Sequence, residues 1–273
     1  MPITVRPLTS SIGAEIDGVD LSRSLAGETV AEIRQALLDH LVIFFREQTL
    51  TPSQQLEFAT QFGEPIEYPF VEPLPDTPFI VPIVKLEHET LNFGGSWHSD
   101  TVYLETPPLG TVLYARQVPP VGGDTLFANQ YLAFDSLSAG MKELLNGLTG
   151  IHRSDKLDAT RKVIQNALGE PDENTRMSQH PVVRTHPETG RKALYLNVSH
   201  TTSFKGMTET ESAPILAYLF QQQIRPEFCC RFRWQAGSLA FWDNRCSLHY
   251  PVNDYHGHRR EMHRITLAGE RPR

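Results

Sequence analysis

The chain has 273 residues, 40% of them hydrophobic, which is enough for one large core, and we expect a single domain over residues 1–273. A formal net charge of −7, with no basic run longer than Arg259-Arg260, argues against a nucleic-acid or anionic-membrane partner and favours a small molecule. No segment approaches the roughly 20 apolar residues that span a bilayer, and the start lacks a signal-peptide pattern, so we expect a cytoplasmic protein.

The three cysteines are Cys229, Cys230 and Cys246, an odd number without Cys-x-x-Cys spacing. This pattern predicts reduced thiols and indicates neither a disulfide framework nor a zinc site. The sequence leaves open whether the protein forms a homo-oligomer.

Hydrophobic periodicity and turn residues divide the first half of the chain into helices and short strands. The expected elements are helices over 29–40 and 51–62 and strands over 41–45, 102–104, 111–115 and 126–128. Thr51 and Pro52 are typical of an N-cap and a first-turn proline, and Gly63 is a stop signal. Residues 64–97 hold six prolines, which favours a loop-rich wall of an active site.

The second half is richer in strands. The expected elements are helices over 131–148 and 212–223 and strands over 182–184, 193–197, 228–234, 238–242 and 260–268. Residues 152–178 are polar and weakly patterned, so we expect a mobile insertion or lid there. Several short strands separated by Gly, Pro, Asn and Asp suggest a sandwich or a double Greek key.

His98 and Asp100 form a His-x-Asp pair at the edge of an expected strand. With 11 His and 12 Asp in the chain, the number of His-x-Asp occurrences expected by chance is about one half, so the spacing alone carries little weight. Side chains alternate at period two along a strand, however, so both residues can chelate one ion. Together with the distant His249 they offer two imidazoles and one carboxylate, a set that leaves one face of an octahedral metal open and suits ferrous iron enzymes that activate oxygen.

Two arginines lie close to the end of the chain, in an expected strand. Arg260, Met262 and Arg264 are all even-numbered and therefore face one side, with the two arginine Cα atoms about 13 Å apart. Each arginine could hold a different anion. A lone guanidinium inside a barrel would cost several kcal/mol, so each needs a partner.

The ordered motifs resemble the taurine dioxygenase family of iron(II) and 2-oxoglutarate-dependent oxygenases. They are Trp97-His98-x-Asp100, Gly122-Gly-Asp-Thr125, Trp242-Asp-Asn-Arg-x-x-x-His249, Arg259-Arg-x-Met-His-Arg264 and the amino-terminal Ile12-Gly-Ala-Glu-Ile-Asp-Gly-Val-Asp20. The resemblance covers nearly the whole chain. It implies a mainly β fold with helical insertions, a double-stranded β-helix or distorted jelly roll of the cupin-like kind.

The resemblance also implies roles for single residues. His98, Asp100 and His249 would be the iron ligands, and Arg260 and Thr125 would bind the distal carboxylate of 2-oxoglutarate, because guanidinium is a two-pronged, permanently charged donor. The keto acid end would chelate the iron and leave one position for O2. The implied reaction hydroxylates the substrate and converts 2-oxoglutarate to succinate and CO2.

The substrate is less well specified. Arg264 matches the arginine that pairs with the sulfonate in the taurine enzyme, which implies an anionic substrate. Tyr68 stands where that enzyme has a histidine, Gly94 where it has an asparagine, and His200 where it has a phenylalanine; Tyr68 and His200 are candidate substrate contacts. A sulfonate such as taurine, an alkyl sulfate and an aryloxy carboxylate all remain open.

Two other classes fit part of the pattern. A non-catalytic cupin-like metal-binding or regulatory module could share the barrel and the metal residues, but a regulator of DNA would need a basic element that this acidic chain does not supply. A zinc hydrolase could use the same ligand types, although it would leave Arg260 without a function.

Overall fold

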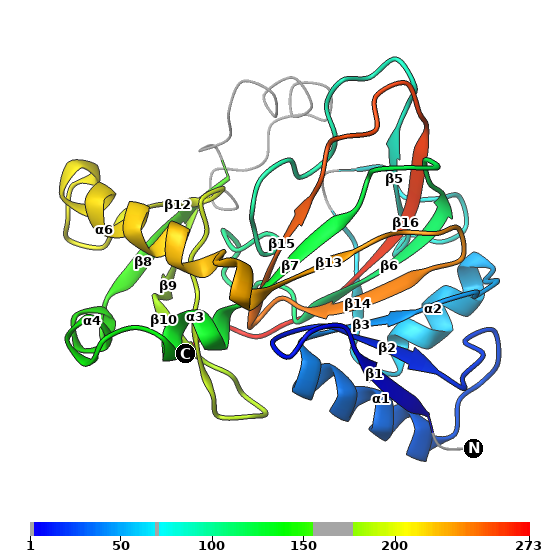
Figure 1. Ribbon diagram of the computed structural model, residues 1–273, viewed down its shortest axis with the longest axis horizontal. Helices are drawn as coiled ribbons and strands as arrows, with labels where there is room; N and C mark the ends of the chain where they lie inside the picture. Colours follow the sequence, from blue (N-terminus) through cyan, green and yellow to red (C-terminus); the bar gives the residue numbers. More distant parts are fainter. Residues whose placement is uncertain (1–2, 69–70, 155–176) are drawn as a thin grey trace.

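The computed structural model describes residues 3–68, 71–154 and 177–273 of the chain. Its centre is a large sheet packed against a smaller one (Figure 1). The large sheet contains β1 (Thr4–Pro7), β2 (Ala14–Asp17), β3 (Val42–Phe45), β14 (Leu239–Asp243), β6 (Gly110–Gln117), β16 (Arg260–Leu267) and β4 (Pro65–Ile66) in that order, with β5 (Val81–Lys85) paired to β16. The smaller sheet contains β13 (Cys229–Phe232), β7 (Thr125–Asn129) and β15 (Ser247–Pro251).

Aromatic side chains fill the space between these two sheets. Phe44 of β3 stacks on Phe232 of β13 with ring centroids 3.9 Å apart, and it meets the edge of Phe127 of β7 at 5.6 Å. All three rings are fully buried. This face-to-face packing of two mainly antiparallel sheets confirms the predicted distorted jelly roll.

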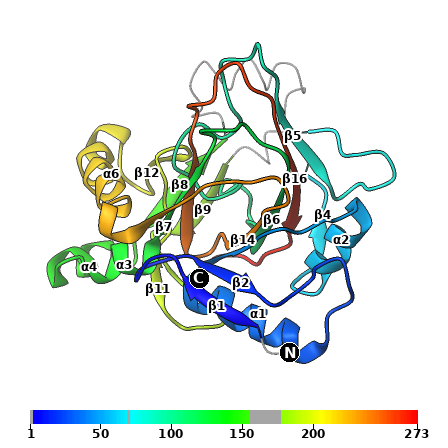
Figure 2. The ribbon, with the colours of Figure 1, turned by 45° about the vertical axis from the view of Figure 1, so that its right-hand side comes forward.

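Helices α1 (Gly27–His40) and α2 (Pro52–Thr60) cover the outer face of the large sheet (Figure 2). Ile33 and Leu37 of α1 and Phe58 of α2 share a core cluster with Phe45 and Phe241 of the sheet. Because β3 and β14 are buried on both faces, their sequences are apolar without alternation, as expected for covered strands.

A second group of elements packs beside the two sheets. Its members are α3 (Gln130–Asp135), α4 (Ala139–Leu145), α6 (Glu209–Gln223), the 3-10 turn Pro226–Phe228, the sheet of β12 (Thr201–Phe204), β8 (Thr149–Arg153) and β9 (Met177–Pro181), and the pair β10 (Val183–Thr185) and β11 (Lys192–Leu194). They bury their own apolar cluster, which includes Leu194, Phe204 and Leu219. Figure 1 shows α6 and α4 on the opposite side of the molecule from α2.

Several predicted helix boundaries are close to those observed. Thr51 caps α2 with a reciprocal pair of hydrogen bonds to Gln54, and Pro52 is the first helical residue, as predicted. The single helix expected over 131–148 is wrong, because α3 ends at Asp135 and Ser138 then caps a separate helix by accepting a hydrogen bond from the Met141 N–H.

The strand expected over 102–104 is also wrong. This segment is a turn in which the Leu104 N–H donates to the Thr101 carbonyl at 2.9 Å, and Thr101 has a φ of 41°. The strand expected over 193–197 is shorter than predicted and ends at Leu194. Most of the insertion expected over 152–178 lies outside the described residues, and the part that is described belongs to β8 and β9.

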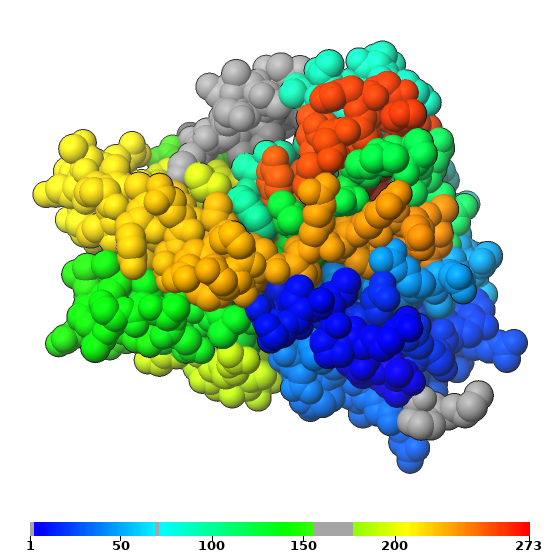
Figure 3. Space-filling model, in the orientation of Figure 1, coloured from blue at the N-terminus to red at the C-terminus, as the bar shows by residue number. Residues whose placement is uncertain are grey.

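The proline-rich stretch 64–97 is less irregular than predicted, because it contains β4 and β5, and β5 extends the large sheet beside β16. The segment after β5 contacts the segment after β15, where Asn253 Nδ2 donates to the Thr90 carbonyl at 2.8 Å and Asn92 Nδ2 to the Pro251 carbonyl at 2.9 Å. Figure 3 shows these segments, turquoise and orange-red, against each other at the upper right. No helix in the described ranges is long and apolar enough to cross a membrane.

Candidate active site

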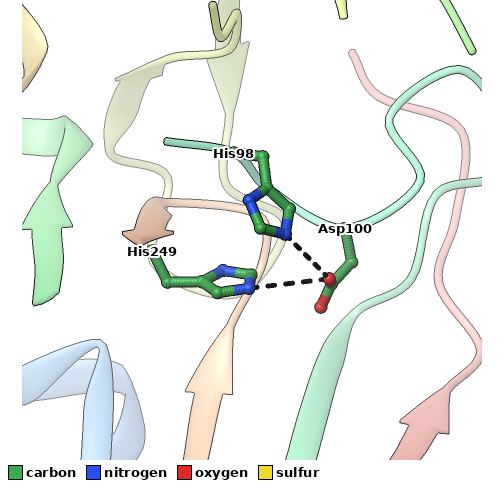
Figure 4. A group of neighbouring side chains, drawn as sticks. All are labelled: His98, Asp100 and His249. Carbon is green, nitrogen blue, oxygen red and sulfur yellow. Dashed lines mark ion pairs between the residues drawn. The ribbon is translucent and has the colours of Figure 1, made fainter. Parts of the chain in front are cut away.

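His98, Asp100 and His249 come together inside the sandwich (Figure 4). His98 and His249 form an isolated antiparallel bridge in which each backbone N–H donates to the other carbonyl, at 3.0 and 2.8 Å. Asp100 Oδ1 lies 3.8 Å from His98 Nε2 and 3.7 Å from His249 Nε2. The three donor atoms lie within 4.8 Å of one another, and all three residues are buried, so they can share one metal ion.

Hydrogen bonds fix which atoms face the metal position. His98 Nδ1 lies 2.7 Å from the Ser96 carbonyl, which can only accept, so Nδ1 carries the proton and the lone pair is on Nε2. Asp100 Oδ2 accepts from Thr111 Oγ1 at 2.7 Å and from Asn244 Nδ2 at 3.1 Å. Asp100 Oδ1 is therefore left to face the two imidazoles.

Arg264 of β16 supplies the charge that compensates Asp100. Its Nη2 lies 3.0 Å from Asp100 Oδ1, and both residues are buried, with Asp100 3% and Arg264 5% exposed. Burial alone would raise the pKa of Asp100, but Arg264, together with the two histidines and the Thr111 hydroxyl, lowers it below its ordinary value. Asp100 is therefore ionised and ready to bind a cation.

Arg260 lies four residues earlier on the same strand, and its surroundings are different. It is 7% exposed, and no ion pair is found for it among the described residues. Its Nε has no hydrogen-bond partner, and burial lowers the pKa of the guanidinium. Two aromatic rings lie nearby, with the guanidinium carbon 5.8 Å from the Trp234 ring centroid and 6.0 Å from that of Tyr255. The Asp124 carboxylate raises the guanidinium pKa in part, but it is already paired with Arg231 at 2.6 Å. Among the described residues, Arg260 therefore has no ion-pair partner of its own.

Thr125 lines the cavity with Arg260, and its hydroxyl is oriented by Trp234. Trp234 Nε1 donates to Thr125 Oγ1 at 2.9 Å. An indole N–H can only donate, so it occupies an acceptor site of the hydroxyl and leaves the Thr125 proton for another acceptor. A hydroxyl donor and an unpaired guanidinium thus lie on one cavity.

This cavity has a volume of about 470 Å³, including space open to solvent, and joins the metal position to both arginines. Its lining residues are Ile83, Phe93, Gly94, His98, Asp100, Leu113, Thr125, Trp242, His249, Pro251, Arg260 and Arg264. Asp100 is the one carboxylate in this lining, and the apolar side chains are those of Ile83, Phe93, Leu113, Trp242 and Pro251. The lining therefore offers candidate ligands for a metal, two cations for anionic groups and an apolar surface.

Tyr68 and His200, the other predicted substrate contacts, are not among the residues that line this cavity. The Tyr68 ring lies under the Arg264 guanidinium, 4.6 Å from its central carbon. His200 is buried against Tyr103, with ring centroids 5.0 Å apart, and its Nδ1 is 3.1 Å from the Arg153 carbonyl. Tyr68 thus contacts Arg264, and neither Tyr68 nor His200 is a lining residue of this cavity.

A second group with metal-ligand atoms, His186, Asp243 and Cys246, lies outside this cavity. Asp243 accepts from Arg245 Nη2 at 2.6 Å and from His186 Nε2 at 3.0 Å. Burial raises the pKa of the Cys246 thiol well above its ordinary value, so it is protonated. Arg245 donates to both oxygens of Asp243, whereas Arg264 contacts one oxygen of Asp100. A carboxylate with both oxygens held and a neutral thiol make a poor metal site, so we interpret this group as a structural ion-pair network.

Sequence reasoning missed the residues that support the ligands. Thr111 and Asn244 hold Asp100, and Trp234 holds Thr125, over sequence separations of 11, 144 and 109 residues. Nothing in the local pattern distinguishes these residues from ordinary core positions. The one available signal was that Asn244 lies within the motif from Trp242 to His249.

Comparison with known proteins decides the family. Residues 4–266 match the model of the taurine catabolism dioxygenase TauD, TfdA family. The chain belongs to that family. It is 36% identical to an alpha-ketoglutarate-dependent sulfate ester dioxygenase of Pseudomonas putida, over 100% of this chain and 91% of the relative. It is 30% identical to an alpha-ketoglutarate-dependent 2,4-dichlorophenoxyacetate dioxygenase of Cupriavidus pinatubonensis, over 99% of each.

A crystal structure of a taurine dioxygenase from Burkholderia xenovorans superposes with a TM-score of 0.85 at 38% identity, covering 100% of this chain and 91% of that one. Together with the family match, this confirms the family and the fold that the motifs predict. The enzyme class is also confirmed: this family member is a dioxygenase that uses Fe(II), 2-oxoglutarate and O2, and the described residues place a His-Asp-His triad where such a metal needs one.

Proposed function

We propose that this oxygenase hydroxylates a small anionic substrate with an apolar body, and that an alkyl sulfate ester is the best candidate. His98, Asp100 and His249 would hold the iron, Arg260 and Thr125 the distal carboxylate of 2-oxoglutarate, and Arg264 the anionic group of the substrate. When bound, the iron and the keto acid would supply the oxidising power. The protein residues bind, orient and exclude water.

The observation that carries the proposal is the buried Arg260 guanidinium, which has no ion-pair partner among the described residues and lies in the same cavity as the three proposed metal ligands. An uncompensated buried guanidinium is costly, and a carboxylate that accepts from it and from the Thr125 hydroxyl would remove that cost. A zinc hydrolase would not supply such a carboxylate. A non-catalytic module would have no need of one.

The cavity lining favours a sulfate ester over taurine. Taurine carries an ammonium group as well as its sulfonate, and the one carboxylate of the lining is the proposed metal ligand Asp100. An alkyl chain would instead contact Ile83, Phe93 and Leu113. Several relatives act on such anions by name, among them the sulfate ester and phenoxyacetate dioxygenases.

For a sulfate ester, the proposed reaction releases inorganic sulfate and an aldehyde. Hydroxylation of the carbon that bears the sulfate oxygen gives a carbon with both a hydroxyl and a sulfate. That carbon loses sulfate and a proton to form an aldehyde, while 2-oxoglutarate and O2 yield succinate and CO2. The measurement is therefore succinate and inorganic sulfate release across alkyl sulfates, taurine and aryloxy acids. Equal amounts of both products from alkyl sulfates support the proposal, and taurine as the best substrate would overturn the choice of substrate.

The site assignment has a separate test that does not depend on substrate. Anaerobic addition of Fe(II) and 2-oxoglutarate should produce the weak visible charge-transfer band of the chelate. In Arg260→Met the 2-oxoglutarate needed for half of this band should rise by about 30-fold or more, because an unpaired buried carboxylate costs about 2–5 kcal/mol. Arg259→Met is the matched control, because Arg259 is partly exposed and paired with Glu261 at 2.8 Å. Equal behaviour of the two variants would remove Arg260 from this role.

A further inference from the structure

Lys85, at the end of β5, is a second buried cation beside Arg260. It is 3% exposed, its Nζ has no hydrogen-bond partner, and no ion pair is found for it among the described residues. A lysine ammonium is strongly hydrated in water and is costly to bury without an anion. Neither the family motifs nor the cavity lining includes this residue.

The strand register places Lys85 next to Arg260. The two residues are directly opposite each other in the antiparallel pair of β5 and β16, which run side by side in Figures 1 and 2. Directly opposite residues point to the same face with Cβ atoms about 4.5–5.5 Å apart. Ile83, two residues before Lys85, lines the cavity, so Lys85 shares the inward face of β5.

Both cations lie against one aromatic ring. Lys85 Nζ is 4.6 Å and the Arg260 guanidinium carbon 6.0 Å from the Tyr255 ring centroid. Tyr255 is itself buried, at 3% exposed. A tyrosine face offsets only part of the cost of burying a cation, and two like charges on one ring repel each other. The nearby carboxylates of Asp124 and Asp254 are both paired with Arg231, and neither buried cation has an ion-pair partner among the described residues. An anion at this end of the site would therefore interact favourably with both cations.

We propose that Lys85 is a positioning residue for the co-substrate, which strengthens binding of the distal carboxylate of 2-oxoglutarate from behind Arg260. This rests on the proposed assignment of Arg260. Lys85 is level with Arg260, whereas Arg264 lies four residues further along β16 and is compensated by Asp100. The Lys85 charge therefore acts on the anion at the Arg260 end and not on the anion at the Arg264 end.

The test is calorimetric titration of the Mn(II)-loaded protein with two keto acids. 2-Oxoglutarate carries the distal carboxylate, and 2-oxopentanoate has the same five-carbon chain without it. Lys85→Met should raise the Kd for 2-oxoglutarate by about tenfold or more, which corresponds to one buried charge interaction of modest strength, and should leave the Kd for 2-oxopentanoate within about twofold. Lys85→Arg, which keeps the charge, should stay close to the wild-type Kd for both.

Thermal melting of the ligand-free protein gives an independent readout. Removing an uncompensated cation should leave the melting temperature of Lys85→Met unchanged or higher, while the further rise on adding 2-oxoglutarate becomes smaller. A structural anchor would show the opposite pattern, a lower melting temperature and an unchanged Kd, and that result would overturn the proposal. Equal losses for both keto acids, or equal losses in Lys85→Met and Lys85→Arg, would also overturn it.

Arg260→Met in the same titration distinguishes failure of the role of Lys85 from failure of the proposed function. If it loses 2-oxoglutarate affinity and Lys85→Met does not, the role of Lys85 is wrong and the proposed function stands. If neither variant loses affinity, the assignment of the distal carboxylate to this end of the site is wrong as well.

Discussion

Thr111 should set the iron affinity although it touches no metal. Its hydroxyl donates to Asp100 Oδ2 at 2.7 Å, and it is 0% exposed. In Thr111→Val this bond is lost at nearly constant volume. A hydrogen bond to a charged group contributes about 1.5–3 kcal/mol, which is roughly 10- to 150-fold in an equilibrium constant. Asn244 still donates to the same oxygen at 3.1 Å, so we expect the low end, about a tenfold loss of metal affinity.

The physical reason is competition for Asp100 Oδ1. Without Thr111 the carboxylate can rotate about its Cβ–Cγ bond and give both oxygens to Arg264, which already lies 3.0 Å from Oδ1. The metal must then displace a stronger ion pair. Anaerobic calorimetric titration of the metal-free protein with Fe(II), repeated with Mn(II), measures the change.

Thr266→Val is the matched control for this experiment. Thr266 lies directly opposite Thr111 in the β6–β16 pair and is 2% exposed, and its hydroxyl has no hydrogen-bond partner. The substitution is therefore the same in chemistry, strand pair and burial, and differs in the contact with Asp100. Metal affinity that is unchanged in Thr111→Val, or lost equally in both variants, would refute the reasoning.

Two further outcomes are expected. Gly94→Ala should weaken metal binding, because a Cβ at this position would lie 2.9 Å from His98 Cε1. Gly257 has a similar positive φ but open space around it, so Gly257→Ala measures the backbone cost alone. Equal metal affinity in the two variants would contradict the steric clash. Arg245→Met should lower the free energy of unfolding by about 3–5 kcal/mol at neutral pH, since it removes the arginine from the buried Asp243 carboxylate and leaves it with the His186 imidazole. Arg245 helps to lower the pKa of Asp243, so its contribution to the free energy of unfolding is complete above the ordinary carboxyl pKa of about 4 and decreases as the pH falls below that value. Urea unfolding of wild type and Arg245→Met at several pH values measures this contribution. A difference between the two proteins that does not change with pH would contradict the prediction.

The convergence of the three proposed metal ligands was predicted because the motif fixes residue types, but the geometry expected for it was wrong in part. The segment after Asp100 is a turn, with Thr101 at a φ of 41°, and not the strand that was expected to align His98 and Asp100. The alignment comes from the backbone bridge between His98 and His249. A backbone pairing between residues 151 positions apart cannot be recognised from the local sequence around His98. The two side chains were therefore expected on the same side, but through strand alternation and not through this bridge.

The alternation of β16 was predictable from period two alone. Arg260, Met262 and Arg264 are all buried on one face, and both arginines line the cavity, as predicted. Which anion or carboxylate each arginine meets depends on neighbouring strands and loops. Lys85 was missed for that reason: it lies in a stretch that its prolines marked as irregular, and its importance appears when β5 is found paired with β16.

The two arginines of this strand face therefore differ in what they still require. Arg264 is compensated by Asp100 within the protein, so that end of the cavity is stable without a ligand. Arg260 has no such partner, and Lys85 adds a second uncompensated charge beside it. A metal that takes Asp100 Oδ1 would remove the compensation of Arg264, whereas a dicarboxylate would supply the charge missing at Arg260. Metal and co-substrate would thus act on opposite ends of one strand, and a metal that claims Asp100 would leave Arg264 to the anionic substrate that we propose.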